Sequence, residues 1–131
     1  MKKYTFLLAL LIPAFLIAQK KDLKNIKVDK DSFENIKVIP LHSDEQVSVF
    51  IVFVKKEVAL HKHVHHTEMV SILDGKGIMT LGDETFKIKK GDFFVIPKGI
   101  PHSVRTTGRK PLKAISTQAP KFEGKDRIFL N

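Results

Sequence analysis

Residues 69–99 read MVSILDGKGIMTLGDETFKIKKGDFFVIPKG and carry the clearest indication of the fold class. Short runs rich in apolar residues cover 69–73, 78–81, 85–89 and 93–96. Each run stops at a glycine accompanied by Asp or Lys, residues that tolerate the backbone conformations of tight turns. Within 85–89, Phe86 and Ile88 alternate with lysines, which is the period of a strand with one buried face. The stretch therefore predicts consecutive short β-strands joined by turns.

The same pattern continues on both sides of this stretch. Residues 47–54, VSVFIVFV, are too apolar for a one-sided surface strand, so we expect them to be buried on both faces. Residues 102–106 and 112–118 add two strands, the second bounded by prolines. Roughly eight or nine short strands without a ten-residue helix predict an all-β sandwich or barrel. An immunoglobulin-like sandwich is the alternative, but that fold normally has a core Trp and this chain has none.

The composition limits the chemistry. With 131 residues, 43% of them hydrophobic, the chain has room for one domain with its own core. It has no cysteine, which excludes disulfides, thiolate nucleophiles and iron–sulfur clusters, so His, Asp or Glu must hold any metal. The net charge is +9, yet the lysines lack the interleaved aromatic residues of a nucleic-acid site. We interpret the charge as an aid to solubility or an attraction to an anionic surface or substrate.

The N-terminus has the pattern of an export signal. Lys2 and Lys3 precede an apolar stretch over residues 6–18, which Pro13 interrupts. This stretch is shorter than the ~20 apolar residues of a membrane-spanning helix. It therefore predicts a secretory signal peptide over residues 1–18, with an uncleaved anchor as the alternative, and an exported, periplasmic or secreted protein. Residues 19–32 alternate lysine with aspartate and are interpreted as a tether or a loosely docked arm.

Histidines gather in one part of the chain. Residues 61–68 read HKHVHHTE, and in an extended strand His61 and His63 project from the same face, about 6.6 Å apart along the chain. Two imidazoles so placed can share one metal ion. Glu68 follows closely enough for a turn to return its carboxylate to the same point. A second stretch, 91–102, reads GDFFVIPKGIPH and delivers His102 after a turn.

The spacing of these residues resembles the two motifs of the cupin superfamily. The matches are His61-x-His63-x4-Glu68-x6-Gly75 for the first motif and Gly91-x5-Pro97-x-Gly99-x2-His102 for the second. Two positions depart from the pattern. Thr106 stands where the second motif commonly closes with Asn, and Lys55 stands where the first usually opens with Gly. Neither is a ligand position, so both departures concern turn geometry.

The resemblance implies a single-domain cupin jelly-roll β-barrel over residues 33–118, followed by a C-terminal tail over 119–131. It implies one divalent transition metal in the barrel, Zn, Cu, Mn, Fe or Ni, held by His61, His63, Glu68 and His102. Together with the predicted signal peptide, it implies an exported metalloenzyme that acts on a small molecule, with an oxygenase-, decarboxylase- or isomerase-like activity. The alternative is a non-catalytic periplasmic module that binds a small ligand or a metal. Small one-domain cupins resemble one another in forming dimers through edge strands, so we expect a homodimer. We expect neither nucleic acid nor, after cleavage of the signal peptide, a membrane as a partner.

Other polar residues near the motifs have open roles. His65 and His66 lie in the turn between predicted ligands, either as an ordinary polar loop or at the pocket mouth for proton shuttling or anion contact. Arg105 is out of phase with His102 along its strand and should face outward. The residues expected to form core or pocket wall are Phe50, Phe53, Met69, Met79 and Phe86.

Overall fold

The computed structural model describes residues 20–130, which form an all-β fold with one short 3-10 helix, η1 (Lys30–Ser32). The strands are β1 (Ile36–Ser43), β2 (Ser48–Val54), β3 (Glu57–Lys62), β4 (Thr67–Asp74), β5 (Lys76–Leu81), β6 (Glu84–Lys89), β7 (Phe93–Ile96), β8 (His102–Thr106), β9 (Leu112–Ala119) and β10 (Ile128–Phe129). The predicted fold class is confirmed. The expected signal peptide, residues 1–18, lies outside the described residues. Within residues 20–130, no helix has the length and apolar character needed to span a bilayer.

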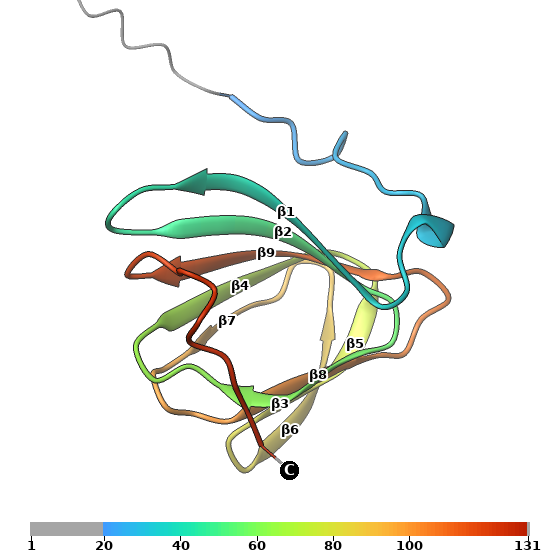
Figure 1. The fold of residues 1–131 in the computed structure, drawn as a ribbon. Coiled ribbons are helices and arrows are strands. Elements are labelled where there is room, and N and C mark those ends of the chain that lie inside the picture. The colour runs from blue at the N-terminus through green and yellow to red at the C-terminus, as the bar shows by residue number, and fades with distance from the viewer. Residues whose placement is uncertain (1–19, 131) are drawn as a thin grey trace, which may run out of the picture.

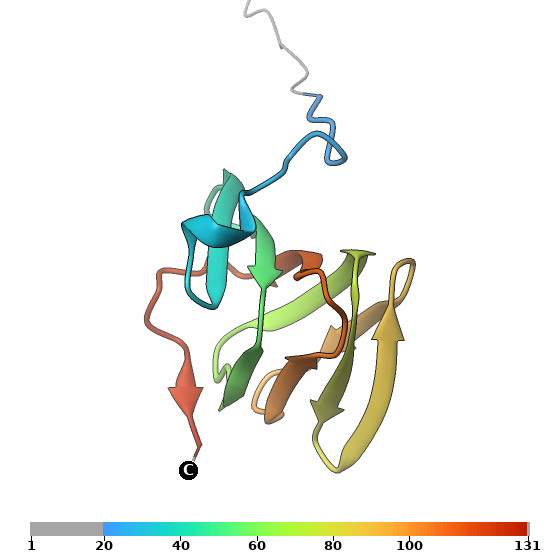
Figure 2. The same cartoon turned by 90° about the vertical axis from the view of Figure 1, so that its right-hand side faces the viewer.

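The strands build two antiparallel sheets that face each other (Figure 1). The first sheet has the order β1-β2-β9-β4-β7 and the second β10-β3-β8-β5-β6. From β4 onward the chain passes repeatedly between the sheets, which is the behaviour of a jelly roll. Figure 2, the view turned by 90°, shows β1 and β2 of the first sheet at the upper left and β5 and β6 of the second sheet at the right. The expected barrel therefore consists of two facing sheets that are not closed into one continuous ladder.

The apolar core lies between these sheets. Val54, Ile72 and Leu112 enter it from the first sheet, and Met79 and Ile88 from the second, each at most 3% exposed. Fully burying one such side chain contributes about 1.5–3 kcal/mol. The lysines on either side of Ile88 are exposed, so the alternation in the sequence does give β6 one buried face.

The outer face of β2 is covered as well. Phe50 and Val52 point toward the interior and line a cavity there, whereas Ile51 and Phe53 face the other way and are still only 0% and 6% exposed. The Lys113 Nζ lies 5.5 Å from the Phe53 ring centroid. It also donates hydrogen bonds of 2.6 Å to the carbonyls of residues 23 and 26. The N-terminal arm therefore crosses this face, which accounts for the burial predicted for residues 47–54.

Two further lysines fix the arm at its ends. The Lys21 Nζ donates to the Leu41 carbonyl of β1 at 2.9 Å, and the Lys55 Nζ donates to the Phe33 carbonyl at 2.8 Å. The arm is thus held by lysine-to-carbonyl hydrogen bonds, and its apolar residues Leu23, Ile26 and Val28 are half-buried.

The turns that the motifs require are formed by glycine where the backbone demands it. Gly75 has φ +82°, and a Cβ on it would lie 2.9 Å from the Pro111 carbonyl oxygen. Only glycine fits this turn, because the conformation and the close approach both disfavour a side chain. At the end of β8, the Thr106 hydroxyl donates to the Val54 carbonyl at 2.8 Å. This hydrogen bond ties β8 to the end of β2 at the position where the cupin motif commonly has Asn.

The segment that follows β9 returns across the molecule to the other sheet. It leaves the first sheet at Ala119 and adds β10 to the edge of the second, where Ile128 pairs with Lys62 and Phe129 with His61. Figure 1 shows it in dark red, ending at the C-terminus. Residues 120–130, expected as a tail, are called the C-terminal strap below.

Candidate metal centre

Three histidine side chains come together on the inner face of the second sheet. His61 lies near the end of β3, His63 follows that strand, and His102 opens β8. Strands β3 and β8 are paired in a register that sets His61 opposite His102. Each imidazole is 4% exposed or less. One ring nitrogen from each of the three lies within 4.8 Å of the other two.

The outer nitrogens of these rings are held by backbone carbonyls. The Nδ1 of His61 bonds to the Ala59 carbonyl at 2.8 Å, and that of His102 to the Ile100 carbonyl at 3.0 Å. The Nδ1 of His63 bonds to the carbonyl of Asp126 in the C-terminal strap. A carbonyl only accepts, so each Nδ1 must carry the proton and each Nε2 keeps its lone pair. Such outer contacts fix the tautomer and orientation of metal-binding histidines.

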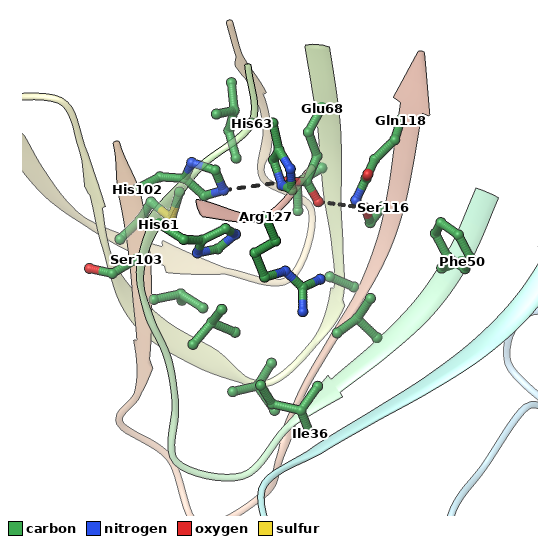
Figure 3. Close-up of a pocket in the computed structure, with 18 of the residues that line it drawn as sticks. Ile36, Phe50, His61, His63, Glu68, His102, Ser103, Ser116, Gln118 and Arg127 are labelled. Atoms are coloured by element: carbon green, nitrogen blue, oxygen red, sulfur yellow. Dashed lines mark hydrogen bonds and ion pairs between the residues drawn. The ribbon is translucent and has the colours of Figure 1, made fainter. Parts of the chain in front are cut away.

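Glu68 reaches this cluster from the opposite sheet. Its Oε2 lies 3.5 Å from the Nε2 of His63 and 3.5 Å from the Nε2 of His102. Its Oε1 accepts a 2.5 Å hydrogen bond from the hydroxyl of Ser116 on β9. The structure thus brings together all four residues that the motifs single out, His61, His63, Glu68 and His102 (Figure 3).

The protonation states of the cluster favour the binding of a cation. Burial lowers the pKa of His61 to about 4, because desolvation disfavours its charged form. Desolvation acts on His63 in the same direction, but the adjacent Glu68 carboxylate and the Asp126 carbonyl outweigh it and raise its pKa. Burial also disfavours charge on Glu68, yet contacts with His102 and His63 hold the pKa of this carboxyl well below its usual range. At neutral pH the cluster therefore has an ionised carboxylate beside a neutral His61.

The C-terminal strap supports the cluster through Asp126, which is 7% exposed. One carboxylate oxygen accepts from the Val64 backbone N–H at 2.9 Å. The other accepts from the backbone N–H groups of His65 at 2.7 Å and His66 at 3.1 Å, and contacts the His66 Nδ1 at 2.5 Å. Burial opposes ionisation, but the hydrogen bonds from His65 and His66 hold the pKa of Asp126 well below its usual range. The His66 Nε2 is occupied by the Lys121 carbonyl at 2.8 Å.

His66 is therefore neither a loop residue in solvent nor a residue of the pocket mouth. It is 6% exposed and hydrogen-bonded on both ring nitrogens, whereas His65 is exposed. His63, His66 and Asp126 are also close enough to hold a metal ion. Both His66 nitrogens and the facing Asp126 oxygen already have hydrogen-bond partners, so we interpret this second group as a hydrogen-bond network and not as a metal site.

The first cluster does fit a metal. Within the described residues, the Nε2 atoms of His63 and His102 are buried and have no hydrogen-bond partner. Buried polar atoms of this kind need a partner, and an unprotonated Nε2 offers a lone pair to a cation. Three imidazoles with one carboxylate form a donor set suited to borderline divalent transition ions.

A cavity of about 670 Å³ opens beside the cluster. Most of its wall is aliphatic, from residues such as Val52, Val70 and Ile96, and Phe50 lines it as expected. The four cluster residues lie at its polar end, together with Ser116, Gln118 and Arg127 (Figure 3). The arrangement provides room for a small organic molecule beside a metal.

Several residues of this region were not predicted from the sequence. Asp126 and Arg127 lie in the predicted tail, and Ser116 and Gln118 lie on a strand read only for its apolar pattern. The alternation of Ser116 and Gln118 along β9 was an available signal, because both project from the same face. Arg105 is exposed, as expected. Met69, expected in the core or pocket wall, is half-buried and does not line the cavity.

Residues 48–117, more than half of the chain, match the Cupin domain family, and the chain belongs to this family. An uncharacterised protein of Aquifex aeolicus is 34% identical over 109 residues, which is 82% of this chain and 89% of the relative.

Solved structures share the fold. A Klebsiella pneumoniae protein with a double-stranded β-helix domain has a TM-score of 0.71 at 16% identity, covering 88% of this chain and 99% of that one. The Lactobacillus farciminis oxalate decarboxylase, solved with formate, has a TM-score of 0.64 at 23% identity, covering 75% of this chain and 32% of the decarboxylase.

Proposed function

We propose that this protein is an exported metal-binding cupin that acts on a small molecule in the cavity beside the metal. His61, His63, Glu68 and His102 would hold one divalent transition metal. The observation that carries the proposal is the pair of buried Nε2 atoms, on His63 and His102, without a partner in the described residues. They face the ionised carboxylate of Glu68, which would balance part of the charge of a cation.

The residues around the metal would have separate roles in orienting its ligands and in binding the substrate. When bound, a divalent ion supplies a Lewis acid that polarises an oxygen of the substrate or activates a small oxygen ligand. The backbone carbonyls of residues 59, 100 and 126 keep the three imidazoles in the ligating tautomer. The Ser116 hydroxyl holds Glu68 in place from β9. The aliphatic walls of the cavity exclude water from the apolar part of the substrate.

An enzyme is the first candidate, in an oxygenase-, decarboxylase- or isomerase-like class. The cavity of about 670 Å³ favours a protein that binds a small molecule over a site that only stores a metal, because metal storage needs no such space beside the ion. The shared fold with an oxalate decarboxylase is consistent with it but does not select the reaction. The second candidate is a non-catalytic periplasmic module that binds a small ligand. Turnover of a panel of small acids and phenols by the metal-loaded protein separates the two.

Metal analysis tests the site itself. Replacing His102 with Ala should reduce the bound metal to a small fraction of the unsubstituted protein, measured by elemental analysis after dialysis. His65→Ala is the matched control, because His65 belongs to the same histidine-rich stretch and is exposed. Equal loss of metal from both variants would refute the ligand assignment.

Export is proposed from residues 1–18, and cell fractionation tests it. Lys2 and Lys3 do not form a twin-arginine signal, so the chain would cross the membrane unfolded and acquire metal outside the cytoplasm. Intrinsic affinities there favour copper and zinc over manganese and ferrous iron. We expect zinc or copper in protein isolated from its own compartment, and a mixture including nickel or iron when residues 19–131 are produced in the cytoplasm. The same iron content in both preparations would contradict this expectation.

A further inference from the structure

The cavity contains one cation that the metal site does not use. Among the described residues, its wall includes one carboxylate, Glu68, and one side chain with a permanent positive charge, Arg127. Figure 3 shows the Arg127 side chain extending from the strap into the cavity beside His61. Glu68 does not neutralise it, because its Oε1 is bonded to Ser116 and its Oε2 faces two imidazoles.

Arg127 is anchored at its backbone and free at its guanidinium. The residue before it, Asp126, is fixed by four contacts, and the residue after it, Ile128, pairs with Lys62 in β10. The guanidinium carbon lies 6.0 Å from the ring centroid of Phe122 in the same strap. Within residues 20–130, the guanidinium makes no hydrogen bond and no ion pair. Arg127 is exposed overall, so a ligand entering the cavity can reach its guanidinium, and its anchored backbone reduces the entropy that is lost when a ligand binds.

A second unpaired group lies at the same end of the cavity. Gln118, on β9 opposite Glu68, is 4% exposed, and its Oε1 is buried without a partner in the described part of the chain. A buried amide oxygen without a partner is costly, so a hydrogen-bond donor on a bound molecule would complete it. Gln118 therefore indicates, independently of Arg127, that the polar end is completed by a ligand.

The charges favour an anionic ligand. A divalent ion held with one carboxylate would leave the polar end positive, and Arg127 adds a further positive charge. A planar guanidinium matches a carboxylate through two parallel hydrogen bonds. A phosphate carries about two charges and three strong acceptor oxygens, which call for more donors. No lysine and no second arginine of the described residues lines the cavity.

We infer that the ligand of this cavity is a small carboxylate with an apolar body, whose carboxylate is bound by Arg127 and whose body packs on the aliphatic wall. This inference rests on the proposed function and names its substrate class. It makes Arg127 a specificity-determining residue supplied by the C-terminal strap, outside both cupin motifs.

Calorimetric titration of the zinc-loaded full chain tests the inference. The probes are butanoate, hexanoate and octanoate, each beside its uncharged amide, together with hexyl phosphate. We expect the carboxylates to bind at least about tenfold more tightly than the amides, because a hydrogen-bonded charge pair carries the difference. Arg127→Met should remove most of this preference, and Arg127→Lys should restore part of it, since it keeps the charge but loses the planar fork. Amide binding should stay unchanged in both variants.

Lys125→Met is the matched control, because Lys125 is an exposed cation of the same strap that does not line the cavity. It should bind hexanoate as the unsubstituted protein does. Equal binding of carboxylates and amides, absence of carboxylate binding, a preference for hexyl phosphate, or equal losses in the Arg127 and Lys125 variants would each overturn the inference. Zinc content is measured on every sample. A chain that binds no zinc but still binds hexanoate through Arg127 refutes the metal proposal alone, and a zinc-bound chain without carboxylate preference refutes the inference alone.

Discussion

Replacing Asp126 with Ala tests whether the C-terminal strap positions the residues of the candidate metal centre. The side chain accepts hydrogen bonds from three consecutive backbone N–H groups, residues 64–66, and contacts the His66 ring. Val64 and His65 are exposed, so water can replace their bonds, whereas His66 is buried. Two bonds from the buried residue to a charged acceptor, at about 1.5 kcal/mol or more each, give a loss of about 3 kcal/mol.

This loss is large but should leave the protein folded, since domains are stable by about 5–15 kcal/mol. At about 4–6 °C per kcal/mol for a domain of this size, the unfolding midpoint should fall by roughly 12–18 °C. The backbone carbonyl of Asp126 also orients the His63 ring. Releasing it should weaken zinc binding by about 10- to 100-fold, as is typical when an outer contact of a metal ligand is lost.

Circular dichroism melting of the metal-free protein measures the first effect, and competition with a chromophoric zinc chelator measures the second. Glu123→Ala is the control, because it removes a carboxylate from an exposed position of the same strap. Asp126→Asn should lie between the two, since it keeps the shape and loses the charge. If Asp126→Ala matches Glu123→Ala in both midpoint and zinc affinity, the strap does not position the site.

Three further outcomes are expected. Zinc affinity should fall about tenfold per pH unit below the pKa of His63, because a proton on its Nε2 must leave before the metal binds. Glu68 raises that pKa above 6.5. In zinc titrations at a series of pH values, a loss of affinity that begins only below pH 6.5 would contradict the assignment of His63 as a ligand. Lys113→Met should free the arm and speed its limited proteolysis several-fold with zinc content unchanged, whereas equal cleavage in the exposed control Lys110→Met would count against the docking. We also expect a homodimer through an edge strand, since β7 is an edge and its Phe93 is 60% exposed; light scattering at the mass of a single chain would refute it.

Much of the fold could be predicted from local sequence. The glycine turns mark the ends of β4, β5 and β6, because tight turns need backbone conformations that few residues adopt. Alternation around Ile88 correctly predicted one buried face. The boundaries of the two sheets could not be predicted in this way. Sheet membership depends on long-range pairing, such as β2 with β9, which no short window of sequence encodes.

The four clustered residues were predictable for a related reason. His61 and His63 are close in sequence, so strand geometry alone brings their side chains near one another. Glu68 and His102 come from other strands, and only the fixed spacing of two motifs signalled that they belong to the same site. The structure supplies what the motifs imply, because β3 pairs with β8 and Glu68 crosses from the facing sheet.

The amino-acid sequence alone predicts the all-β class, the turn positions and the identity of the clustered residues, because each depends on contacts or conformations within a few residues or on a motif of fixed spacing. The positions of His66, Asp126 and Arg127 beside the cluster became visible only in the tertiary structure. Asp126 lies about 60 residues from the loop that it holds, and its partners become visible only once the strap has crossed from β9 to the edge of β3. That path is set by packing between distant elements, which leaves no periodic or motif-like trace in the sequence.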